Sequence, residues 1–149
     1  MGTTCTALAL CGHSAYCAHV GDSRLYLLRG GEIYLMSEDH SAVMDLVRRG
    51  MLKREAARQH ADRNVLLRAL GTQREIAVAS WQKPFPVREG DTFVLCSDGL
   101  YDLVEDAEIK NAALANEPQV ACEALIALAK ERGGHDNITV GVVHLAADV

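Results

Sequence analysis

The stretch Thr92-Phe93-Val94-Leu95-Cys96-Ser97-Asp98-Gly99 is a short apolar run that ends in an aspartate beside a glycine. A run of this length, rich in β-branched and aromatic residues and closed by turn residues, predicts a buried strand. Asp98 and Gly99 are ordinary turn residues, because Asp hydrogen-bonds its own backbone and Gly accepts positive φ. Asp102 follows four residues later, within reach of the same loop. This strand end is the first candidate for a functional site.

The same setting occurs twice more along the chain. Asp22 follows an apolar run and Gly21, and Asp136 follows two glycines and precedes another apolar run. A plain turn explains any one of them. If the strands form one sandwich, however, several ends can meet at one edge, where clustered carboxylates repel unless a cation neutralises them. Mg²⁺ and Mn²⁺ prefer such oxygen ligands, and a pair of them can activate water and hold a phosphoryl group.

Periodicity and turn residues predict the remaining elements. Four short strands joined by tight turns, over 3–11, 15–20, 25–28 and 32–36, suggest an antiparallel meander. Short charged helices are expected over 44–50 and 53–60, a strand over 76–82, helices over 106–116 and 118–133, and a last strand over 138–145. We expect Val120, Ala121, Ala124, Leu125 and Leu128 to form the apolar face of the second long helix, with Pro118 at its start and Gly133 at its end.

Composition excludes several classes of function. With 149 residues, 49% hydrophobic and 23% charged, the chain has the size and make-up of one globular domain. Its net charge of −5 argues against nucleic acid as a partner, and no apolar run is long enough for a membrane span. The start lacks the pattern of a secretory signal. Five cysteines without a C-x-x-C pair suggest free thiols and a cytoplasmic location.

Six segments, in order, resemble motifs of the metal-dependent protein serine/threonine phosphatases of the PP2C (PPM) family. They are Gly-Thr-Thr at 2–4, Gly-Asp-Ser-Arg at 21–24, Asp-His at 39–40, the segment 64–71, Ser-Asp-Gly-x-x-Asp at 97–102 and Asp-Asn at 136–137. The resemblance implies an α+β fold in which an antiparallel β-sandwich is flanked by helices. Residues 1–149 would form one partial phosphatase domain, with the family's flap over about 37–71.

The resemblance also implies roles for individual residues. Asp98 and Asp136 would be catalytic and would ligate two Mn²⁺ or Mg²⁺ ions, while Asp22, Asp98 and Asp102 would form a third, weaker metal site. Ser97, Gly99 and Asn137 would support these ligands. The implied activity is hydrolysis of phosphoserine or phosphothreonine by a metal-activated water. The implied partners are phosphorylated proteins and a counteracting Ser/Thr kinase in bacterial signalling. Arg48 and Arg49 are candidates for docking an acidic phosphopeptide, although a solvated helix face is the default interpretation.

The sequence departs from the family at its start. Members carry an N-terminal segment whose aspartate bridges both metals, and nothing precedes the Gly-Thr-Thr motif here except Met1. The domain is therefore expected to be N-terminally truncated, with little activity of these 149 residues alone. A non-catalytic phosphatase fold that serves as a binding or assembly module stays open as an alternative, as does a regulatory phosphatase of the sporulation or sigma-factor-control type. Absent strands would leave open edges, so we expect a homo-oligomer or a partner that supplies the missing segment.

Overall fold

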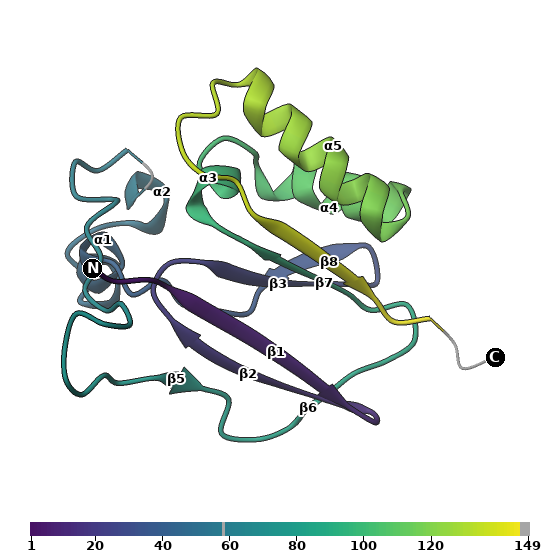
Figure 1. Cartoon of the computed structure of the whole chain (residues 1–149), viewed down its shortest axis with the longest axis horizontal. Helices are drawn as coiled ribbons and strands as arrows, with labels where there is room; N and C mark the ends of the chain where they lie inside the picture. Colours follow the sequence, from purple (N-terminus) through teal and green to yellow (C-terminus); the bar gives the residue numbers. More distant parts are fainter. Residues whose placement is uncertain (58, 147–149) are drawn as a thin grey trace.

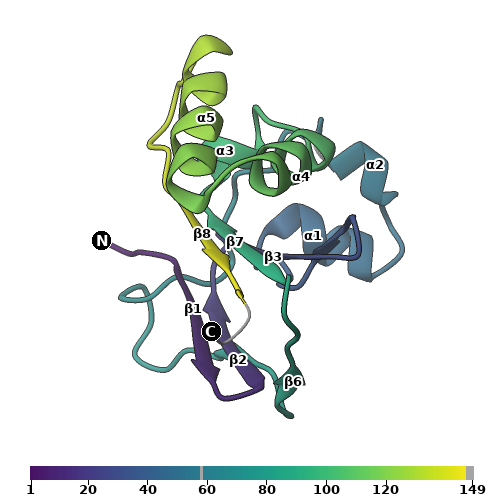
Figure 2. The same cartoon turned by 90° about the vertical axis from the view of Figure 1, so that its right-hand side faces the viewer.

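Two four-stranded antiparallel sheets form the frame of the molecule in the computed structural model, which describes residues 1–57 and 59–146 (Figure 1). The first sheet contains β1 (Cys5–Cys11), β2 (Ser14–Val20), β5 (Ala79–Ser80) and β6 (Phe85–Pro86), with β5 and β6 both pairing with β2. The second has the order β4 (Glu32–Leu35), β3 (Arg24–Arg29), β7 (Thr92–Cys96) and β8 (Val140–His144). β1 and β8 are thus the outer strands on one side, and Figure 2 shows them on the same side of the sandwich.

The core between the sheets comes from alternate residues of their strands. Ala15 and Cys17 of β2 pack against Leu25 and Leu27 of β3 and Phe93 of β7. The other face of the second sheet is equally apolar, because helices α3 (Asp98–Tyr101), α4 (Asp106–Ala115) and α5 (Pro118–Glu131) cover it. A strand buried on both faces is apolar without alternation, which explains the run of four apolar residues in β3. The architecture is a β-sandwich with helices on one outer face.

The predicted four-stranded meander is wrong. The first four strands form two hairpins, β1–β2 and β3–β4, and these belong to different sheets. Gly21 carries the chain across with φ +111°, and a Cβ at this position would lie 2.4 Å from the Thr4 Cγ2 atom. β3 pairs with β7 instead of β2. The alternation of apolar and polar residues along the strands specifies each hairpin. It does not specify which sheet the hairpin joins, because the same residues are buried in either sheet.

The two long helices form where the sequence predicts them, but their ends and their buried residues differ from the prediction. α4 and α5 end at Ala115 and Glu131, slightly before the predicted ends. The buried stripe of α5 is Ala121, Leu125 and Ala129, while Val120 is 49% exposed. The predicted strand over 76–82 is reduced to the two residues of β5. A short helix, α3, begins directly at Asp98, where we expected a loop.

The segment between the two halves of the sandwich carries α1 (Ala42–Arg48) and α2 (Arg54–Ala57), and we call residues 37–71 the flap. The Ser41 hydroxyl accepts a hydrogen bond from the Met44 backbone N–H and so caps α1. Val43, Met44 and Ala57 form a small apolar cluster of their own. Among the described helices, none is long and apolar enough to cross a membrane.

Candidate metal centre

Two acidic loops are tied together at one end of the second sheet. β7 pairs with β8 up to Cys96 and Val140, and the hydrogen bonding then continues past both strands. The Ser97 backbone N–H donates to the Thr139 carbonyl (3.0 Å), and the Thr139 N–H donates to the Ser97 hydroxyl oxygen (3.0 Å). That hydroxyl in turn donates to the Asn137 carbonyl (3.1 Å). Ser97 therefore holds the loop of Asp98 against the loop of Asp136.

Gly99 permits the close contact between these loops. A Cβ on Gly99 would lie 2.3 Å from the Asn137 carbonyl oxygen, so only glycine fits there. Each loop also orients its own aspartate. Asp98 Oδ1 accepts from the Gly99 N–H (2.9 Å), and Asp136 Oδ1 accepts from the Asn137 N–H (2.7 Å).

The four predicted carboxylates influence one another through Asp98. Burial raises the pKa of Asp98 above its ordinary value, and the charges of Asp136 and Asp102 raise it further. The pKa of Asp22 is raised to about 6, first by burial and then by the charges of Asp98 and Asp39. Asp22 is buried and Asp98 half-buried, whereas Asp102 and Asp136 are exposed. Asp98 is thus the member of the group that interacts with all the others.

Oxygen donors of this kind match the preference of Mg²⁺ and Mn²⁺, and a cation would offset the repulsion that raises the pKa of Asp22 and Asp98. The chemistry of the donors therefore fits a hard dication. Across residues 1–57 and 59–146, however, no three His, Cys, Asp or Glu side chains lie close enough together to hold a metal ion. The predicted ligands therefore lie near one another as a loose group.

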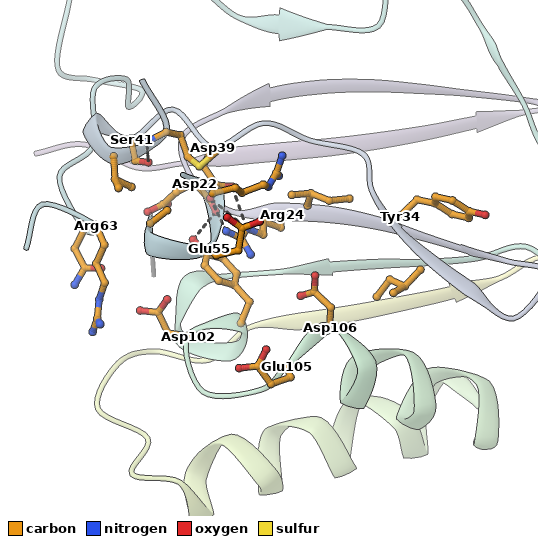
Figure 3. Close-up of a pocket in the computed structure, with 18 of the residues that line it drawn as sticks. Asp22, Arg24, Tyr34, Asp39, Ser41, Glu55, Arg63, Asp102, Glu105 and Asp106 are labelled. Atoms are coloured by element: carbon orange, nitrogen blue, oxygen red, sulfur yellow. Dashed lines mark hydrogen bonds and ion pairs between the residues drawn. The ribbon is translucent and has the colours of Figure 1, made fainter. Parts of the chain in front are cut away.

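A cleft of about 650 Å³ opens beside this group, between the flap and the start of α3 and α4 (Figure 3). Ser41, Glu55 and Arg63 approach it from the flap, and Asp102, Glu105 and Asp106 approach it from the helical side. Its charged lining consists of six carboxylates (Asp22, Asp39, Glu55, Asp102, Glu105 and Asp106) and three arginines (Arg24, Arg54 and Arg63). The cleft is therefore mainly acidic.

The two arginines predicted to dock substrate do not line this cleft. Arg48 forms ion pairs with Glu38 (3.4 Å) and with Asp45, and Arg49 pairs with Asp45 at 2.7 Å. More than half of each arginine side chain is exposed, so both stay accessible on the flap surface. A role for them in substrate docking stays a prediction.

Arg24 is the organising residue that motif matching alone did not assign. Its guanidinium makes a nearly buried ion pair with Asp39 (Nη2 to Oδ2, 2.7 Å) and lies 3.7 Å from the centre of the Tyr101 ring. The Tyr101 hydroxyl donates to the Asp22 carbonyl oxygen (2.9 Å). Arg24 and Tyr101 together connect the flap, the helical side of the cleft and Asp22.

The raised pKa of Asp22 predicts a pH-dependent cost in stability. Its pKa rises from 3.8 to about 6 on folding, so the folded state binds the proton more tightly than the unfolded state. The free energy of unfolding should therefore fall as pH rises from about 4 to 6, with the full penalty above that range. We expect Asp22→Asn to raise the free energy of unfolding by about 1–3 kcal/mol at pH 7 and to leave it nearly unchanged at pH 4. Urea denaturation in EDTA at both pH values measures this, and an equal effect at both would contradict it.

The chain is similar in sequence and in structure to known protein phosphatases. A sequence model described as "Protein phosphatase 2C" matches residues 1–63. The serine/threonine phosphatase Stp of Listeria innocua is 39% identical over 144 residues, which cover 96% of this chain and 56% of that protein. The crystal structure of the Mycobacterium tuberculosis serine/threonine phosphatase PstP/Ppp superposes with a TM-score of 0.89 at 40% identity, covering 99% of this chain and 61% of the other.

A second solved structure, the catalytic domain of PstP in complex with two manganese ions, has a TM-score of 0.84 at 38% identity and covers 99% and 60% of the two chains. These similarities confirm the predicted α+β sandwich. They also show that the chain spans a little more than half the length of the relatives it matches.

Proposed function

Because this chain is similar over nearly its whole length to serine/threonine phosphatases, and its first 63 residues match the protein phosphatase 2C model, we propose that it supplies the metal-binding carboxylates of a protein serine/threonine phosphatase. The reaction is hydrolysis of phosphoserine or phosphothreonine in a protein. The observation that carries the proposal is the junction of the Asp98 and Asp136 loops through Ser97, with Asp98 electrostatically coupled to its acidic neighbours. Plain turns would not require this junction.

Asp98 and Asp136 would hold two dications, and Asp22, Asp98 and Asp102 would hold a third, weaker one. Mn²⁺ or Mg²⁺ bound there would lower the pKa of water and neutralise charge on a phosphoryl group. Ser97, Gly99 and Asn137 keep the two ligand loops in contact, and Arg24 and Tyr101 hold the backbone at Asp22. Within the described residues no three of these side chains lie close enough together to hold one ion, so each ion would also be bound by water.

The charge of the cleft supports metal dependence. Carboxylates outnumber arginines six to three in its lining, and Arg24 is already paired with Asp39. A phosphate dianion that enters this field is repelled unless dications offset the carboxylates. Arg54 and Arg63 line the cleft from the flap, and their positive charge would attract the phosphopeptide.

The test combines metal binding with turnover. We expect Mn²⁺ to bind the wild-type chain in isothermal titration calorimetry, and Asp98→Ala to weaken that binding at least tenfold because the charge of Asp98 interacts with those of all the other proposed ligands. A phosphothreonine peptide should be hydrolysed slowly in Mn²⁺, with no hydrolysis in EDTA or in Asp98→Ala. Asp62→Ala is the matched control, since Asp62 is 60% exposed in the flap, away from the group.

Each result decides between the two hypotheses. Hydrolysis that persists in EDTA, or in Asp98→Ala, would overturn the proposed chemistry. The non-catalytic binding or assembly module would be favoured if the chain binds Mn²⁺ or phosphopeptide but shows no turnover. The assay conditions should include those under which a full-length relative is active. That alternative has one observation in its favour, the absence of a three-ligand group among the described residues.

Partners follow from the same proposal. The substrates would be phosphorylated proteins, and a Ser/Thr kinase would oppose the reaction, as part of bacterial signalling. A cytoplasmic location is consistent with five cysteines that are all free thiols.

A further inference from the structure

His40 ties the flap to the turn that follows β2 through three hydrogen bonds, which we call the His40 clamp. Its backbone N–H donates to the Gly21 carbonyl oxygen (2.8 Å), and its Nδ1 atom accepts from the Gly21 N–H (3.2 Å). Its carbonyl oxygen accepts from the N–H of Leu67 (2.8 Å), on the returning part of the flap. A single residue therefore holds both ends of the flap at the same turn.

The geometry of the clamp defines the protonation state of His40. A backbone N–H can only donate, so the Nδ1 atom that accepts from Gly21 carries a lone pair and no hydrogen. The ring is therefore neutral, with its hydrogen on Nε2. A second proton would go to Nδ1 and would set two N–H groups against each other. Both residues are buried, so the Gly21 N–H would then lack an acceptor.

A second histidine lies against the clamp. The ring centroids of His19 and His40 are 4.9 Å apart, and only 3% of His19 is exposed. Its Nε2 atom lies 3.1 Å from the Glu38 carbonyl oxygen, to which it must donate, and its Nδ1 atom lies 2.9 Å from the Thr6 hydroxyl oxygen. A neutral His19 thus already holds the chain two residues before His40. A charge on one ring would disfavour a charge on the other.

The surroundings of the two rings also oppose a proton on His40. Burial is the largest cause that holds the pKa of His40 below its ordinary value of 6.5, and the charged neighbours are, in order of effect, His19, Arg68, Glu38 and Arg48. Of these, Glu38 alone favours the proton. Burial likewise lowers the pKa of His19, against smaller opposing effects of backbone hydrogen bonds and of the charge of Asp39.

We propose that His40 is a pH-sensitive clamp, which holds the flap on the Gly21 turn while its ring is neutral and releases the flap when its ring is protonated. The contribution of the clamp to stability is complete above about pH 6.5, the ordinary pKa of histidine, and is lost as the pH falls through the lower pKa of folded His40. Ser41, the next residue, lines the cleft, so release loosens one wall of it. The proposal concerns the attachment of the flap and does not depend on the proposed function.

Global stability is a poor measure of the clamp because Asp22 titrates in the same range. The contribution of Asp22 to the free energy of unfolding falls as the pH rises from about 4 to 6, whereas the contribution of the clamp rises. The two trends offset each other in a denaturation curve. The test therefore needs probes of individual hydrogen bonds.

Amide hydrogen exchange followed by NMR provides such probes. We expect the protection factors of the Gly21, His40 and Leu67 N–H groups to fall by about tenfold or more between pH 7.5 and pH 5. The protection factor is a ratio to the intrinsic exchange rate, so it removes the pH dependence of exchange itself. Val94, buried on β7 between β3 and β8, is the internal reference and should change by less than about twofold.

Nitrogen chemical shifts of the imidazole rings test the protonation state directly. At pH 7.5 the His40 ring should carry its hydrogen on Nε2 and none on Nδ1, because Nδ1 accepts from Gly21. The ring should titrate below pH 6.5, at the same pH at which the amide protection is lost.

His40→Asn separates the hydrogen bond from the charge. The amide oxygen of Asn can replace Nδ1 as the acceptor for the Gly21 N–H and is not protonated in this range, so protection should persist at pH 5. His40→Ala removes the acceptor and should lower the protection of Gly21 about tenfold at both pH values. His13→Asn, in the exposed turn between β1 and β2, is the matched control and should keep the wild-type pH dependence.

His19→Gln identifies which of the two rings is the sensor. The amide nitrogen of Gln can replace Nε2 as the donor to the Glu38 carbonyl oxygen, and it does not titrate. The pH dependence of the clamp should therefore survive in His19→Gln. Asp22 is present in all four variants, so its own titration cannot produce a difference between them.

The proposal is overturned if the protection of Gly21 and Leu67 is the same at both pH values, or if Val94 loses protection equally, since the flap would then open only with the whole domain. A His40 ring with its hydrogen on Nδ1 at pH 7.5 would also contradict it. So would a pH dependence that persists in His40→Asn, or one that disappears in His19→Gln.

Discussion

Replacing Arg24 with alanine is expected to lower the free energy of unfolding by about 3–5 kcal/mol. The guanidinium donates to both oxygens of Asp39, through Nε (3.1 and 3.2 Å) and Nη2 (2.7 Å). The side chains of Arg24 and Asp39 are only 15% and 8% exposed, so the substitution leaves a buried carboxylate without its counter-charge. It also removes the contact with the Tyr101 ring and the hydrogen bond to the Tyr26 hydroxyl (3.2 Å).

Urea denaturation of Arg24→Ala, Asp39→Ala and the double variant measures this effect. The double variant should lose much less than the sum of the two single losses, because removing both partners leaves no unpaired charge. Arg132→Ala is the control: its ion pair with Glu108 is more than one-third exposed at both ends, so a loss within about 1 kcal/mol is expected. Additive losses for Arg24 and Asp39 would show that the pair is not coupled.

Gly99→Ala is expected to lower the free energy of unfolding by about 3 kcal/mol and to separate the two acidic loops. The new Cβ would lie 2.3 Å from the carbonyl oxygen and 3.0 Å from the carbonyl carbon of Asn137, and backbone atoms cannot rotate aside as a flexible side chain can. The cost arises from this overlap. It does not come from the backbone conformation of Gly99, which is not in the positive-φ region.

Gly141→Ala gives the matched control within β8, because a Cβ there has no atom within 4 Å. Its free energy of unfolding should change by less than about 1 kcal/mol, and replacing glycine within a strand even favours stability. Thermal denaturation of both variants tests stability, and calorimetric titration with Mn²⁺ tests the site. Unchanged stability and unchanged metal affinity in Gly99→Ala would contradict the close junction of the two loops.

Much of the fold and of the candidate site was predictable from local patterns. The run Thr92–Cys96 is the strand β7, and the helical periodicity after Pro118 is α5. The three aspartates at strand ends and Asp102 were identified from turn chemistry and motif order, and Asp98 does interact with the other three. These features depend on side-chain spacing along a single segment, which is the information that a sequence expresses directly.

Other features depended on which segments meet in space. The order of the first four strands was predicted incorrectly, because a hairpin buries the same residues whichever sheet it joins. The stripe of α5 was displaced toward Ala129, since the residues that face a sheet depend on where the helix lies across it. The contact of Arg24 with the Tyr101 ring required the close approach of α3 to β3.

The sequence by itself determined the α+β class, and it indicated the resemblance to protein phosphatases and the candidate acidic residues, because motifs and turn residues are local properties of the chain. Only the tertiary structure decided that Ser97 and Gly99 join two of the acidic loops and that Asp22 is held by Tyr101 beside a paired arginine. Each of these is a contact between segments far apart in the chain. Such contacts are selected by the packing of the whole core, which no single segment specifies.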